Sequence, residues 1–134
     1  MITVELAQEW NTNDISFLSK AETSDYSVLT LMNDERVNDD MCLYRVFDDQ
    51  EHIASFVCRV DRYESGNEMV VVSAGVNRTP SKSLYALITP FVETVAKKCG
   101  CVCLRGHTEN RGVGRLMRMA GWGLSEYVYR KDVL

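Results

Sequence analysis

The sequence predicts an α/β (α+β) fold in which helices pack on a mixed sheet. Segments with the two-residue period of a strand occur among segments with helical periodicity, in the order strand, one or two helices, three strands, helix, strand, helix, strand. The chain has 134 residues, the usual size of one hydrophobic core, and neither a repeat nor a low-complexity linker divides it. We therefore expect a single domain over residues 1–134.

The first half of the chain is rich in strand signals. Residues 2–6 alternate apolar and polar side chains, which is typical of a half-buried strand. Capping residues and spaced apolar residues over 11–40 indicate one broken helix or two short ones, ending in an acidic loop. Strands are expected at 41–47 and 52–61, on either side of a polar hairpin turn, and the valine run in 68–76 predicts a central strand buried on both faces.

The clearest helix is expected over 79–100. Thr79 can cap its first amides, Pro80 suits the first helical position, and Gly100 suits a left-handed exit. The remaining elements are expected to be a strand, a helix and a final strand, at 101–107, 110–121 and 124–133.

Composition excludes several classes of protein. Hydrophobic residues make up 46% of the chain and charged residues 25%, and no run approaches the roughly 18 apolar residues of a membrane span. The opening segment lacks the basic and apolar regions of a secretory signal, so the expected location is the cytoplasm.

The five cysteines are expected to be reduced core thiols. Cys99, Cys101 and Cys103 alternate with other residues, which predicts that they share one face of a strand. This spacing does not suit a metal site, and an apolar chain of this kind has little need of a disulfide framework.

Charge is distributed unevenly along the chain. Residues 1–69 hold 5 Lys/Arg and 15 Asp/Glu, a balance of -10, whereas residues 70–134 hold 10 Lys/Arg and 4 Asp/Glu, a balance of +6. The second half could therefore attract an anion, although two solvated faces give the same pattern. A small phosphorylated ligand fits better than a nucleic acid, because the basic residues are not interleaved with aromatic ones.

The order of elements and a short segment near the end resemble the GNAT superfamily of acyl-CoA-dependent N-acyltransferases. Asn110, Leu116 and the pair Gly121-Trp122 fall at the spacing of the family's asparagine, helix and glycine-aromatic pair. The resemblance implies a mixed, mostly antiparallel sheet of about six to seven strands with helices on both faces. It also implies transfer of an acyl group from acetyl-CoA to an amine on a small molecule or protein.

The resemblance also implies where the cofactor binds. Gly112 and Gly114 look like a phosphate loop, but only 20 residues follow Gly114, whereas the family's loop precedes about fifty more residues of fold. The matching position is 76–84, which contains no glycine. Backbone amides at a helix start could still hold a pyrophosphate there, or Thr79 could simply cap a helix with a solvated lysine. The candidate cofactor residues are Val76, Arg78, Ser81, Lys82, Ser83 and Asn110.

Two residues are candidates for the general base. Glu68 resembles a carboxylate position that some family members use, and His107 follows a strand and carries an imidazole, the side chain that most often serves as a general base. Each also has a simpler interpretation: Glu68 could be a solvated carboxylate at a strand edge, and His107 could be a structural hydrogen-bond donor. Met117 occupies the position at which the family often has a tyrosine that acts as general acid. Tyr127 or Tyr129 could substitute for that tyrosine.

A second hypothesis keeps the fold without turnover. Loss of both the glycine loop and the tyrosine is compatible with a binding or structural protein, a role that the resemblance implies for degenerate family members in tailed phages. A phage protein of this kind would be virion-associated. The acidic loop at 33–40 favours a cationic acceptor or a protein partner, and an exposed final strand would favour a homodimer.

Overall fold

The computed structural model describes residues 1–21, 27–77, 82–108 and 111–133. Within these ranges the elements in chain order are β1 (Ile2–Leu6), α1 (Thr12–Ser19), α2 (Val28–Val37), β2 (Met41–Asp48), β3 (Glu51–Tyr63), β4 (Gly66–Val76), α3 (Lys82–Lys98), β5 (Cys101–Gly106) and α4 (Arg111–Met119). No helix in this part of the chain is long and apolar enough to cross a membrane.

The strands form one sheet in the order β1-β2-β3-β4-β5. The first four strands are antiparallel neighbours. The connection from β1 to β2 contains α1 and α2, whereas short turns join β2 to β3 and β3 to β4. Strand β5 pairs parallel to β4 after a crossover through α3. The predicted mixed, mostly antiparallel sheet is confirmed. The strand number is lower than the predicted six to seven, because the segment 124–133 forms no strand.

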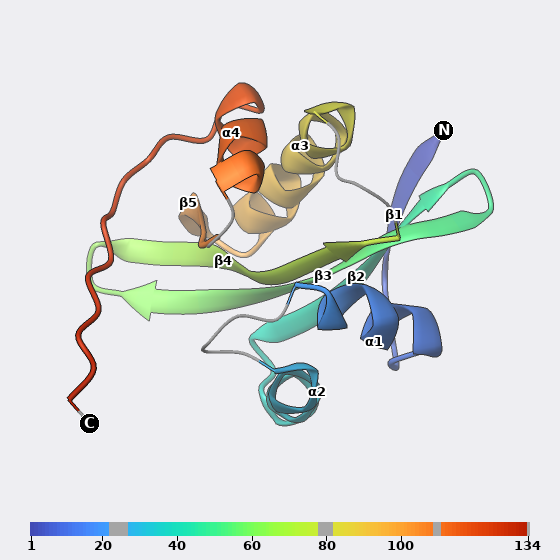
Figure 1. Cartoon of the computed structure of the whole chain (residues 1–134), viewed down its shortest axis with the longest axis horizontal. Helices are drawn as coiled ribbons and strands as arrows, with labels where there is room; N and C mark the ends of the chain where they lie inside the picture. The colour runs from blue at the N-terminus through green and yellow to red at the C-terminus, as the bar shows by residue number, and fades with distance from the viewer. Residues whose placement is uncertain (22–26, 78–81, 109–110, 134) are drawn as a thin grey trace.

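Helices cover both faces of the sheet, as Figure 1 shows: α3 and α4 lie on one face, α1 and α2 on the other. Each face has its own apolar cluster. Phe56, Met69 and Val92 belong to the cluster beneath α3, whereas Leu18 and Val57 belong to the cluster beneath α1 and α2. Burial of these side chains is the main force that holds the helices on the sheet.

Local signals set the helix boundaries. Asn11 caps α1: its side chain accepts from the Asp14 amide, and the Asp14 carboxylate accepts from the Asn11 amide, which makes a capping box. Ser27 caps α2 in a similar way. After α3 the chain turns through Gly100 at φ 72°, as predicted for a left-handed exit.

Candidate functional site

Strands β4 and β5 are paired over only part of the length of β4. Their pairing begins at Asn67 and Cys101 and ends where Val71 meets Gly106. Strand β4 continues to Val76 and stays paired with β3 over this length. Residues 72–76 therefore have no β5 partner in the part of the chain that the structure describes.

The amides in this half of β4 have a defined direction. The Asn77 N–H donates to the Ile53 carbonyl oxygen at 3.0 Å, so Asn77 faces β3. Because successive residues of a strand point their amides to opposite sides, Ala74 and Val76 direct their N–H groups away from β3. Both groups thus point toward the side where β5 has ended. Val76 was a predicted cofactor contact, whereas sequence reasoning missed Ala74.

Two buried polar atoms lie along the same segment. Among the described residues, Ser73 Oγ and Asn77 Oδ1 are buried without a hydrogen-bond partner. Buried polar atoms of this kind usually have a hydrogen-bond partner, and the described residues supply none for these two. They frame the stretch of β4 that β5 leaves open.

Gly75 lies where α1 comes closest to the backbone of β4. It is not part of a bulge; the irregularity in β4 lies at Val72, between the partners of Val57 and Cys58. A Cβ atom built on Gly75 would lie 2.0 Å from the carbonyl oxygen of Phe17. The last turn of α1 therefore rests directly on the backbone of β4, which only glycine permits.

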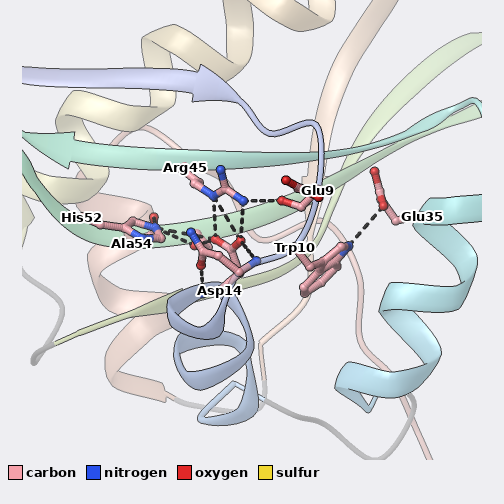
Figure 2. A network of polar contacts seen from close by, with 9 residues as sticks. Glu9, Trp10, Asp14, Glu35, Arg45, His52 and Ala54 are labelled. Carbon is pink, nitrogen blue, oxygen red and sulfur yellow. Dashed lines mark hydrogen bonds and ion pairs between the residues drawn. The ribbon is translucent and has the colours of Figure 1, made fainter.

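A buried carboxylate fixes α1 in this position (Figure 2). Asp14 is fully buried, and its Oδ2 lies 2.9 Å from Arg45 Nη2 on β2. Ser55 Oγ on β3 donates to Asp14 Oδ1 at 2.6 Å. The Arg45 guanidinium also donates to the carbonyl oxygen of Glu9. One carboxylate thus joins α1 to two strands, which satisfies the requirement that a buried charge be paired.

His52 completes this network on β3. Its Nε2 lies 2.9 Å from Ser55 Oγ and 3.0 Å from the carbonyl oxygen of Ala54. The ring also packs against Phe17 and Phe47, with centroids 4.9 and 5.2 Å away. The Ser55 hydroxyl is buried between the Asp14 carboxylate and the His52 imidazole, so we interpret these three residues as a structural network.

The two predicted bases belong to one chain of charged groups. Arg105 Nη1 lies 3.4 Å from Glu68 Oε2 and 3.5 Å from Glu126 Oε1. The other carboxylate oxygen of Glu126 lies 3.7 Å from His107 Nε2. His107 follows Gly106, the last residue of β5 paired with β4, so it lies where the two strands part. Sequence reasoning missed both Arg105 and Glu126, although Arg105 shares strand parity with His107.

An irregularity at Val102 decides which side chains face Glu68. Asn67 pairs with Cys101 but the next residue, Glu68, pairs with Cys103, so β5 carries one extra residue here. Cys101 and Leu104 consequently pack beneath α3, while Cys103 turns to the opposite face. Partial desolvation, followed by a hydrogen bond to Glu68, raises the pKa of the Cys103 thiol.

The cysteine prediction is therefore wrong in part. Cys99 precedes β5 and is exposed, and Cys103 is exposed on the face opposite Cys101. Cys58 is buried as expected, and burial raises the pKa of its thiol to about 12. All five thiols are free. Among the described residues, no group of three or more His, Cys, Asp or Glu could hold a metal ion.

The other predicted cofactor residues lie mostly beyond the described ranges. Arg78, Ser81 and Asn110 fall outside them, whereas Lys82 begins α3 and Ser83 follows it. Since α3 starts shortly after Val76, the amides of the β4 edge and the start of this helix are neighbours in the chain.

The predicted acid candidates are far from buried. Tyr127 is 76% exposed and Tyr129 is 91% exposed, on an extended segment after α4. Trp122, the aromatic residue of the predicted glycine-aromatic pair, donates from Nε1 to Thr89 Oγ1 on α3 at 3.0 Å.

Solved structures share this arrangement. An aminoglycoside 6'-N-acetyltransferase from Acinetobacter haemolyticus matches with a TM-score of 0.74 and 16% identity, over 97% of this chain and 97% of that chain. An aminoglycoside N-acetyltransferase in complex with CoA matches at 0.72 and 14%, over 98% and 95%. A GNAT family acetyltransferase from Staphylococcus aureus matches at 0.67 and 12%, over 98% and 98%.

The similarity extends to proteins described in other terms. A transcriptional regulator from Bacillus halodurans matches with a TM-score of 0.72 and 11% identity, over 98% of this chain and 99% of that chain. No family model and no curated protein matches the sequence. At such low identities a structural likeness establishes the fold, and the chemistry has to be argued from the residues of the site. This chain has the fold of the GNAT acetyltransferases.

Proposed function

We propose that this protein is an N-acyltransferase that transfers an acyl group, with acetyl-CoA as donor, to an amine. One observation carries the proposal: β4 continues past the end of β5 and directs the amides of Ala74 and Val76 into the space that β5 leaves. Amides fixed in one direction polarise a thioester carbonyl without reorganising, and this is the largest contribution such a site makes to catalysis.

The residues around this opening fit a thioester cofactor. Ser73 Oγ and Asn77 Oδ1 are buried and have no hydrogen-bond partner among the described residues, so a bound pantetheine amide would satisfy them. The pyrophosphate would be held by the start of α3, through the amides of Ser81, Lys82 and Ser83 together with Arg78 and Asn110. This last assignment rests on the resemblance to the family and on the positive end of the helix dipole.

Transfer requires that an ammonium group lose its proton. The amine lone pair then attacks the thioester carbonyl carbon, the carbon–sulfur bond breaks, and the leaving thiolate takes up a proton. His107 lies where β4 and β5 part and Glu68 lies further along β4, joined to His107 through Arg105 and Glu126. We propose His107 as the base that receives the proton, because it stands at the opening, and Glu68 as the second candidate.

Binding without turnover is the second candidate function. It is favoured by the side chain at Met117, which cannot donate a proton, and by the exposure of Tyr127 and Tyr129. Because thiolate is a good leaving group, the absence of a general acid lowers the rate of acyl transfer without preventing it. Measuring both cofactor binding and turnover separates the two functions.

The experiment is a thermal-shift titration with acetyl-CoA, using variants at one position. Wild type should be stabilised by about 2.7 kcal/mol when acetyl-CoA reaches 100 times its Kd. Val76→Pro removes the amide that points into the opening while leaving the pairing with β3, so it should abolish the shift. Val76→Ala keeps the amide and should retain the shift. An unchanged melting temperature for wild type at millimolar acetyl-CoA would refute the proposal.

Turnover is tested with an acetyl-CoA hydrolysis and amine-acetylation assay. His107→Asn should lower kcat by roughly 100-fold or more, the usual contribution of a positioned base. Glu64→Gln, in the exposed turn between β3 and β4, is the matched control and should have no effect. If Glu68→Gln lowers kcat and His107→Asn does not, the base is Glu68. Binding with no turnover for any amine tested would favour the second function.

A further inference from the structure

The extended segment after α4 brings one carboxylate to the place where β4 and β5 part. This segment, residues 122–133, forms no helix or strand, and most of its side chains are exposed. Within it, Arg130 and Asp132 pair with each other at 3.4 Å. Glu126 instead reaches the sheet: its two carboxylate oxygens lie 3.5 Å from Arg105 Nη1 and 3.7 Å from His107 Nε2. The inference that follows rests on the proposed acyl transfer, in which His107 is the base.

The start of this segment is fixed, so Glu126 approaches the strands from a defined point. Gly121 turns the chain after α4 with φ 97°. The Trp122 amide then donates to the Met117 carbonyl oxygen at 3.0 Å, and the Trp122 ring nitrogen donates to Thr89 Oγ1 on α3 at 3.0 Å. Four extended residues, the step from Trp122 to Glu126, span only about 13 Å. The helices that cover this face of the sheet therefore determine where the Glu126 carboxylate lies.

Four side chains at this place form a row of alternating charge. Arg105 Nη1 lies 3.4 Å from Glu68 Oε2 and 3.5 Å from Glu126 Oε1. Arginine is always protonated, so the two ionised carboxylates and Arg105 together carry one surplus negative charge. Glu68 has a second donor in the Cys103 thiol, whereas the second oxygen of Glu126 faces the His107 imidazole. A proton on His107 brings the row to neutrality.

The charged pair on the neighbouring strand does not cancel this surplus. Asp61 on β3 is the register partner of Glu68 on β4. Arg59 Nε lies 2.6 Å from Asp61 Oδ1, and this hydrogen bond lowers the pKa of the Asp61 carboxyl. Arg59 and Asp61 thus neutralise each other, and the negative charge beside His107 remains.

We propose that Glu126 is a positioning residue for the base: it orients the His107 imidazole and stabilises the imidazolium that forms during transfer. The carboxylate faces Nε2, so Nδ1 is the nitrogen that accepts the proton. An N–H bond of the substrate ammonium breaks, the proton binds to Nδ1, and the amine lone pair becomes available to attack the thioester carbon. Arg105, held by Glu68, fixes the orientation of the Glu126 carboxylate, as partners of ligating carboxylates do in other sites.

A double-mutant cycle on kcat tests this role. Glu126→Gln keeps the size of the side chain and removes its charge. It should lower kcat about fivefold, the upper range for an ion pair whose side chains are 58% and 48% exposed. Glu126→Asp keeps the charge and should restore most of the rate. Asp132→Asn removes a carboxylate from the same segment and is the matched control, with kcat unchanged. In a His107→Asn background, Glu126→Gln should cause no further loss.

Salt separates an electrostatic role from a structural one. Raising the ionic strength from about 0.01 M to about 1 M shortens the Debye length from about 30 Å to about 3 Å. The difference in kcat between wild type and Glu126→Gln should therefore shrink at high salt. A difference that persists at high salt, or a further loss in the His107→Asn background, would show that Glu126 only supports the fold, and would overturn the inference.

The remaining outcomes distinguish this inference from the proposed function. Acetyl-CoA should raise the melting temperature of Glu126→Gln as much as that of wild type, because the carboxylate acts on the base and not on the cofactor. If both proteins bind acetyl-CoA and turn over at the same rate, only the role of Glu126 is refuted. A higher kcat in Glu126→Gln would mean that the carboxylate obstructs His107, which also refutes it. A wild type that acetyl-CoA does not stabilise, or that acetylates no amine, refutes the proposed transfer together with this inference.

Discussion

Replacing Asp14 with asparagine tests how much the buried network contributes to stability. The Asp14 carboxylate accepts hydrogen bonds from Arg45 Nε and Nη2 at 3.1 and 2.9 Å, from Ser55 Oγ at 2.6 Å and from the Asn11 amide at 2.9 Å. Asparagine keeps the size but loses the charge and directs an NH2 group at one of these donors.

The expected cost follows from the burial of both partners. Asp14 is fully buried and the Arg45 side chain is only 15% exposed, so the variant leaves a guanidinium almost out of water without its counter-charge. Breaking a buried pair in this way costs about 3 to 5 kcal/mol. For a chain of this size, 1 kcal/mol shifts the melting temperature by about 4 °C, so a fall of at least about 12 °C is expected.

Urea unfolding followed by tryptophan fluorescence gives the free energy of unfolding. The control is Asp40→Asn, which breaks an ion pair with Arg62 whose side chains are 40% and 61% exposed. Exposed pairs contribute at most about 1 kcal/mol, so this variant should unfold almost as wild type does. Asp14→Asn combined with Arg45→Met should cost less than the two single changes added together. Equal costs for Asp14→Asn and Asp40→Asn would refute the reasoning.

Further changes test packing and thiol burial. Gly75→Ala should destabilise the protein by about 3 kcal/mol or prevent folding, because the new Cβ would meet the Phe17 carbonyl oxygen at 2.0 Å. Gly123→Ala, with no atom within 4 Å of the added carbon, should be neutral in the same thermal-melting assay. Peptide mapping after alkylation at pH 8 should find Cys99 modified and Cys58 intact, since burial keeps the Cys58 pKa near 12 and its thiol protonated. Labelling of Cys58 at the rate of Cys99 would contradict its burial.

The sequence predicted the elements whose partners lie close in the chain. Strands β2 to β4 follow hairpin and alternation signals, and the predicted strands at 41–47 and 52–61 agree with β2 and β3 to within two residues at each end. The helix pattern before Gly100 likewise reflects one apolar stripe facing the sheet. These features are local, and periodicity reports them directly.

The failures come from information that periodicity does not contain. The alternation in 124–133 predicts a strand, but a strand also needs an edge to pair with, and no single sequence shows where that edge lies. The cysteine pattern assumed an uninterrupted strand, and one extra residue at Val102 turned Cys103 to the other face. A single inserted residue changes every later assignment of a side chain to a face.

The buried network was invisible for a related reason. Asp14 follows Asn11 at the spacing of a capping box, which explains a helix start without any burial. Its partners Arg45 and Ser55 are 31 and 41 residues away, and only the folded chain brings them together. The candidate bases Glu68 and His107 were named from the sequence, but their link through Arg105 and Glu126 required coordinates.

The contact between Phe17 and Gly75 makes α1 and the open edge of β4 mechanically dependent on each other. No side chain lies between the helix carbonyl and the strand, so nothing can absorb a displacement of one against the other. Gly75 stands between Ala74 and Val76, the residues whose amides point into the opening. Any displacement of α1 toward the sheet would therefore press the Phe17 carbonyl on the backbone that carries those amides.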